Sequence, residues 1–225
     1  MPARVGARIH CPDGCPVWNA GVVEVIFERA GDRRYAVEVH RLGVPALRMD
    51  PAPGFDQYFP HDLQHLIVEE QLGIADGIFG RLAKGGTAST FHPVAPDGSG
   101  DDRARSRQQR RLRRRNDRMG AGGSPDFGRS ERATFIVWHD WLTHCPEHEL
   151  RSRAEGMSAT AGSILDRMGS RERLDLCTSL FRVRVRVDTI ARRWASLTSG
   201  QSMSVTWMPS QTSRRAVERR PGHDR

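Results

Sequence analysis

The chain has 225 residues, of which 37% are hydrophobic and 28% charged, and its net charge is +8. This composition is sufficient for a hydrophobic core and excludes collagen, coiled-coil rods and small disulfide-rich secreted folds. No segment approaches the roughly 18 consecutive apolar residues of a membrane span, and the first residues lack the apolar core of a signal peptide. We therefore expect a cytoplasmic protein without membrane association.

The positive charge is concentrated in one segment. Nine arginines and one aspartate lie between Arg103 and Arg118, so the charge of this segment (9 − 1 = +8) equals that of the whole chain. Residues 95–129 contain little to bury, which predicts a disordered arginine-rich linker or, as the alternative, a solvated helix between flexible arms. Such a linker attracts nucleic acid only weakly and non-specifically, because no interleaved aromatic residues stack on bases. The candidate contacts are Arg110, Arg111, Arg113, Arg114 and Arg115.

Residues 21–94 predict a small antiparallel sheet and a helix, after an irregular extension over residues 1–20. Apolar and polar residues alternate over 23–28 and 35–40, on either side of a turn. Alternation is the period of a strand, so these runs predict a hairpin, and the segment ALRMD predicts a third strand. HDLQHLIVEEQL then predicts a helix from Pro60 to Leu72 that Gly73 ends, and GIFGRLA a shorter one.

Residues 130–209 predict three helices and a closing strand. We expect the first helix to be capped by Ser130, because apolar residues follow it at spacings of three and four. In the third helix the stripe from Leu176 to Leu197 has the spacing 4-3-4-3-4-3, so RVRVRV is predicted to be helical although it alternates.

The fold class that follows is α+β. The last two helices are predicted to form an antiparallel hairpin around Gly169. Alternating residues over 203–207 predict a strand that returns to the meander, because a lone strand leaves its backbone unpaired. A disordered basic tail is expected over 210–225.

HDLQH is the strongest candidate for chemistry. His61 and His65 are four residues apart on the predicted helix, so both imidazoles project from one face and can bind a divalent ion such as zinc, iron or manganese. If the protein depends on a metal, Asp62 would take the place of the acid that activates metal-bound water in HExxH proteases. Glu69 shares this face but lies about 12 Å from His61 along the helix axis, too far to complete the site.

A third ligand would have to come from another segment, and WHDWLTHCPEH offers His139, His144 or His148. The alternative is that none converges and that no cofactor binds, with Asp62 acting as a first-turn acid favoured by the helix dipole. We expect this alternative.

A separate zinc site is a further possibility. Cys11 and Cys15 would form one half of it, and Cys145 and His148 the other. The spacing between Cys11 and Cys15 is one residue longer than that of a CxxC knuckle, and the two halves are 129 residues apart.

Two resemblances concern this region. HDLQH resembles the zinc motif of the ubiquinone-biosynthesis scaffold family, in which eleven residues and Glu follow HDxxH, but here that gap ends at Gly77 and the function is not carried over. More broadly, the chain resembles a family of uncharacterised bacterial proteins that share the pattern PAPG…PHDLxH…GIFGxLA. This second resemblance covers about half of the chain and implies no activity.

Three functions remain open. A non-catalytic binding or regulatory module with an unknown protein partner is favoured, because the sequence assembles no complete catalytic constellation. A metal-dependent, hydrolase-like protein that uses the HDLQH helix is the alternative. Weak association of the arginine tract with nucleic acid is the third.

Overall fold

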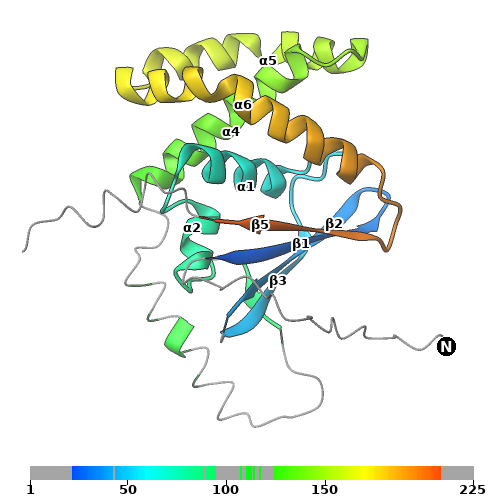
Figure 1. Ribbon diagram of the computed structural model, residues 1–225, viewed down its shortest axis with the longest axis vertical. Coiled ribbons are helices and arrows are strands. Elements are labelled where there is room, and N and C mark those ends of the chain that lie inside the picture. Colours follow the sequence, from blue (N-terminus) through cyan, green and yellow to red (C-terminus); the bar gives the residue numbers. More distant parts are fainter. Residues whose placement is uncertain are drawn as a thin grey trace, which may run out of the picture.

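The structure is a computed structural model, which describes residues 22–42, 44–88, 90–94 and 124–208, and between the last two ranges only residues 107, 110–112, 114 and 117. Figure 1 shows three layers: a sheet, helix α1 (His61–Leu72) above it, and helices α4 (Pro125–Thr143), α5 (His148–Arg167) and α6 (Ser170–Ala195) on the far side of α1. The α+β fold class is confirmed.

The sheet is antiparallel and has the strand order β4-β3-β2-β1-β5. Strands β1 (Val23–Gly31), β2 (Arg34–Arg41) and β3 (Val44–Ala52) form the predicted meander. The returning strand β5 (Ser202–Trp207) pairs with β1, so Val25 lies between Val39 of β2 and Val205 of β5. The two-residue strand β4 (His92–Pro93), which pairs with β3, was not predicted.

Helix α1 lies at the centre of the molecule. It contacts β5 on one side and α4 and α6 on the other, and every residue from 62 to 69 is buried. Its C-terminal cap Gly73 has the left-handed conformation (φ 64°), as a glycine stop requires. The short helix α2 (Ile78–Ala83) follows. A helix buried all round has to find a partner for each polar side chain, and the buried His65 and Glu69 take part in the site described below.

The stripe of α6 is confirmed as a helical face. Val183, Val187 and Trp194 are fully buried, whereas Val185, which lies off the stripe, is 52% exposed. Helices α5 and α6 meet at Gly169 and run in opposite directions (Figure 1), and α4 packs against both.

The predicted boundary at residue 130 is wrong. Helix α4 begins five residues earlier, at Pro125, and Ser124 caps it by accepting a hydrogen bond from the backbone N–H of Asp126. A Ser-Pro pair followed by an acidic residue, as in Ser124, Pro125 and Asp126, is typical of a helix start. The glycines that precede this pair are typical of a linker and favoured the later boundary. Ser130 therefore lies inside the helix, where its side chain is fully buried.

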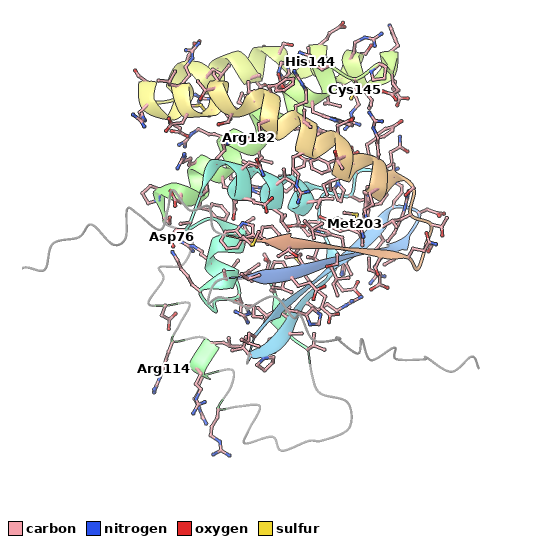
Figure 2. All side chains as sticks on the ribbon, in the orientation of Figure 1. Asp76, Arg114, His144, Cys145, Arg182 and Met203 are labelled. Carbon is pink, nitrogen blue, oxygen red and sulfur yellow. The ribbon has the colours of Figure 1, made fainter. Side chains whose placement is uncertain are left out.

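The arginine tract is described at few positions. Arg107, Arg110, Arg111 and Arg114 are helical and exposed, which agrees at these positions with the solvated-helix alternative and not with a disordered linker (Figure 2). Arg113 and Arg115 lie outside the described residues, as do the N-terminal extension and the basic tail. Among the residues that the structure describes, no helix is long and apolar enough to cross a membrane.

Candidate metal centre

His61, His65 and Glu131 bring three potential metal ligands together. Their donor atoms all lie within 4.8 Å of one another, and within the described part of the chain no other group of three such residues does so. The two histidine Nε2 atoms are 3.0 Å apart, and His65 Nε2 is 3.6 Å from Glu131 Oε1. A tetrahedral ion with bonds of about 2.0–2.1 Å needs donors separated by roughly 3–4 Å. The histidine pair already has this spacing.

The two elements that supply these ligands pack directly against each other. Helix α1 presents both histidines on the face that meets α4, and α4 carries Glu131 one residue after the buried Ser130. His61 is placed by the preceding loop, where its backbone N–H donates to the Gly54 carbonyl oxygen over 3.1 Å. A Cβ atom on Gly54 would lie 2.7 Å from the Cβ of His61, so this approach requires glycine.

His65 is held from behind by a hydroxyl relay. Its Nδ1 lies 2.8 Å from Ser130 Oγ, and Ser130 donates its hydroxyl proton to Glu69 Oε1, also over 2.8 Å. Because that proton is committed to Glu69, the Ser130 oxygen accepts from His65 Nδ1–H. The proton of the neutral imidazole is thereby assigned to Nδ1, and the Nε2 lone pair faces His61 and Glu131. Metal-binding histidines characteristically have such a second hydrogen bond.

Glu69 is the fully buried end of this relay. Its carboxylate also accepts hydrogen bonds from the backbone N–H groups of Ile78, Phe79 and Gly80 at the start of α2. Burial raises the pKa of Glu69 to about 7, although these four hydrogen bonds act in the opposite direction. Glu69 is not one of the three converging donors, and its described link to His65 runs through Ser130.

Burial also keeps His65 neutral. The side chain is 0% exposed, and desolvation, helped by the neighbouring His61, lowers its pKa to about 3. A neutral imidazole is the form that binds a metal ion. His65 is therefore ready to act as a ligand across the whole physiological pH range without first losing a proton.

Asp62 faces another partner. Its buried carboxyl group and the Pro53 carbonyl oxygen, the latter 2.5 Å away, are both within hydrogen-bond distance of the Tyr35 hydroxyl in β2, which has a single proton to share between these two acceptors. Burial raises the pKa of Asp62. Asp62 is not one of the three converging donors, and its predicted role as the acid that would activate a metal-bound water stays a prediction.

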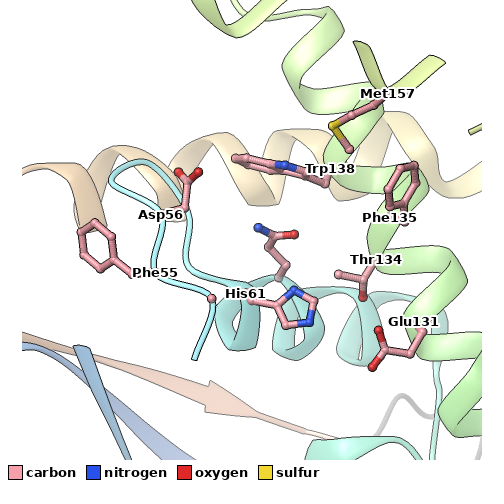
Figure 3. A pocket seen from close by; sticks show the side chains of 10 residues that line it. Phe55, Asp56, His61, Glu131, Thr134, Phe135, Trp138 and Met157 are labelled. Carbon is pink, nitrogen blue, oxygen red and sulfur yellow. The ribbon is translucent and has the colours of Figure 1, made fainter. Parts of the chain in front are cut away.

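A pocket of about 300 Å³ opens beside the trio (Figure 3). His61 and Glu131 line it, whereas the fully buried His65 lies behind them. Three protein donors would leave the fourth position of a tetrahedral ion for water or a ligand, and two of the three residues line this pocket. The other lining residues are Gly54, Phe55, Asp56, Gln64, Thr134, Phe135, Trp138 and Met157.

The predicted third ligands lie elsewhere. His139 Nε2 contacts Ser158 Oγ at 3.2 Å, His144 Nδ1 contacts the Asp140 carbonyl oxygen at 2.7 Å, and His148 is exposed at the start of α5. None of them belongs to the trio. The expectation that no third donor converges on His61 and His65 is therefore wrong, and so is the choice of these three histidines as candidates, because the third potential donor is Glu131.

The separate zinc site with Cys145 stays a prediction. Burial raises the pKa of the Cys145 thiol to about 12, and among the described residues Cys145 belongs to no group of three converging donors. Cys145 lies near His144 at the end of α4 (Figure 2). Cys11 and Cys15 lie outside the described residues.

Sequence reasoning missed Glu131 and Ser130 because both were placed at the edge of a linker. The sequence does carry a signal for them. Once Ser124 and Pro125 are taken as the helix start, Ser130, Thr134 and Trp138 follow at intervals of four on one helical face, with Glu131 beside Ser130. No family model, curated protein or solved structure matches this chain. The resemblance through the PAPG…PHDLxH…GIFGxLA pattern therefore stays a prediction.

Proposed function

We propose that this protein binds one divalent metal ion through His61, His65 and Glu131, and that the ion acts on a small molecule in the adjoining pocket, as in a metal-dependent hydrolase. The observation that carries the proposal is the convergence of the three donors, with the lone pair of His65 already directed at the other two. Glu131 is the third ligand. The sequence alone did not reveal it, and for that reason a non-catalytic module was favoured.

The donor set indicates the class of ion. Two imidazoles and one carboxylate are the protein ligands of hydrolytic zinc sites, and they also suit iron or manganese. An ion in such a site supplies a bound water with a lowered pKa, which is a nucleophile at neutral pH. Of the protein's own groups, His65 is held by Ser130, whereas the Glu131 side chain is 45% exposed and lies at the edge of the pocket.

The adjoining pocket favours a catalytic role of the ion over a purely structural role. Structural zinc sites are closed by four protein ligands, whereas catalytic sites have three and leave one position open. Here three donors converge, and two of them form part of the pocket wall. A molecule bound in the pocket would therefore meet the ion directly.

The test is elemental analysis of protein purified without an affinity tag, followed by titration of the metal-free protein with zinc. We expect one equivalent of zinc in the wild type and its loss in His65→Ala and Glu131→Ala. His139→Ala is the matched control, because His139 is a solvent-accessible histidine of the same helix α4 and lies outside the trio. Unchanged zinc binding in His65→Ala and Glu131→Ala would overturn the proposal.

A further inference from the structure

We propose that the pocket binds a small apolar monocarboxylate, with its carboxylate on the metal ion and its hydrocarbon part against Phe135, Trp138 and Met157. This inference rests on the proposed function, because the ion is the group that would hold the carboxylate. It follows from the shape, the charge and the walls of the pocket.

The charge of the site indicates a single anionic group. A divalent ion bound by two neutral histidines and one glutamate has a net charge of +1, which matches one carboxylate. The other acid in the lining, Asp56, is already paired: its Oδ1 accepts from the backbone N–H groups of Tyr58 and Phe59, and its Oδ2 accepts from Arg153. Among the lining residues that the structure describes, none is lysine or arginine. The guanidinium of Arg153, whose Cζ is 5.5 Å from the Trp138 ring centroid, is already paired with Asp56, so a second anionic group on the ligand would have to compete with Asp56 for it.

The walls indicate that the rest of the ligand is apolar. Phe135, Trp138 and Met157 stand on the side of the pocket opposite His61 (Figure 3), and Phe55 lines it as well. Trp138 is a rigid wall, because its ring stacks on Trp141 with 5.1 Å between the ring centroids and an interplanar angle of 14°. Aromatic side chains held in this way bind flat or compact hydrocarbon groups at little cost in side-chain entropy.

The size of the pocket limits the length of the ligand. A volume of about 300 Å³ is at the lower end of the range for ligand pockets, which indicates a molecule of about one ring and not a polymer chain. Phenylacetate and hexanoate have this size and carry one carboxylate. Acetate has the same charged group without the apolar part, so it is the natural reference ligand.

The experiment compares these ligands on zinc-loaded protein, with zinc stoichiometry measured in every sample. We expect phenylacetate to bind about tenfold or more tightly than acetate, because its ring is buried against the aromatic wall. Met157→Ala and Phe135→Ala should reduce this ratio and leave acetate binding and zinc stoichiometry unchanged. Phe181→Ala, which removes a ring that is 71% exposed on α6, is the control and should leave the ratio unchanged.

The outcomes separate the two proposals. If the protein binds no zinc, the proposed function fails. If zinc binds and phenylacetate is no tighter than acetate, the apolar-ligand inference fails while the metal site stands. Binding of phenylacetate to metal-free protein with equal affinity would place the carboxylate away from the ion and would also overturn the inference. So would tighter binding of benzylamine, because the pocket would then select a cation.

Discussion

Replacing Ser130 by alanine should damage both the stability of the protein and its affinity for metal. Ser130 Oγ is the only atom that joins His65 Nδ1 to Glu69 Oε1 within the described contacts, at 2.8 Å from each. The substitution removes a hydroxyl donor from a buried carboxylate and the best acceptor for the proton on His65. Neither group can turn to solvent, since the side chains of His65 and Glu69 are both fully buried.

The magnitude follows from these two losses. At a pH above 7, where Glu69 is ionised, a hydrogen bond to this charged group contributes about 1.5–3 kcal/mol, and a buried N–H left without an acceptor costs about 1–3 kcal/mol. The second cost is reduced because Thr134 Oγ1 lies 3.3 Å from His65 Nδ1 and remains as a substitute partner. We therefore expect Ser130→Ala to lower the free energy of unfolding by about 2–3 kcal/mol. Zinc affinity should fall about 10–100-fold, as is typical for loss of a partner behind a metal ligand.

The assays are urea unfolding of metal-free protein and zinc titration against a competing chelator. Ser158→Ala is the matched control, because Ser158 also contacts a histidine, His139, at 3.2 Å, but at a solvent-exposed position away from the trio. The double variant Ser130→Ala/Thr134→Val, which removes both partners of His65 Nδ1, should lose more affinity than Ser130→Ala alone. If Ser130→Ala binds zinc as tightly as Ser158→Ala does, the relay does not position His65 and the reasoning is refuted.

Three further predictions concern stability. The folded-state pKa of Glu69, about 7, is above the ordinary value of 4.5, so the contribution of Glu69 to the free energy of unfolding is fully present below pH 4.5 and is lost as pH rises through 7, at up to about 1.4 kcal/mol per pH unit. Glu69→Gln should therefore flatten the pH dependence of unfolding of metal-free protein in this range. An unchanged slope would contradict the assignment. Gly77→Ala should destabilise the protein more than a surface substitution does, since the new Cβ would lie 2.2 Å from Glu69 Oε1; a melting temperature equal to that of the wild type would show that the carboxylate has room to move. Trp194→Ala should lower the free energy of unfolding by about 3–5 kcal/mol in chemical denaturation, because the ring is 0% exposed and its Nε1–H donates to the Asp56 carbonyl oxygen. Arg193→Ala, at an exposed position, is the control and should cost under about 0.5 kcal/mol. Similar losses in the two variants would contradict the helical face of α6.

Local patterns predicted most of the architecture. Alternation over 23–28 and 35–40 is enough for the meander, because the period of two and a short turn leave few other structures. The seven-residue repeat of α6 resolved the ambiguous RVRVRV segment correctly, and Gly73 marked the end of α1 where the structure has it. In each case the determining interactions lie within one element or between neighbours in the sequence.

Only the histidine pair of the candidate site could be predicted, because the third potential ligand is positioned by contacts between elements far apart in the sequence. His61 and His65 lie on one helical face, so their spacing of four identified the pair. Glu131 reaches them through the packing of α1 against α4, across more than sixty residues of sequence, and no local pattern contains that contact. The zinc motif of the ubiquinone-biosynthesis scaffold family requires Glu at the position that Gly77 occupies here. A Cβ at position 77 would collide with the Glu69 carboxylate, so this fold has no room for that ligand.

The most direct test of the metal centre is a crystal of zinc-soaked protein measured at the zinc absorption edge. We predict one strong anomalous peak about 2.0–2.2 Å from His61 Nε2, His65 Nε2 and a Glu131 carboxylate oxygen, with further density on the side of the pocket. A crystal with no peak at the trio, or with its strongest peak at His144 or His148, would contradict the assignment.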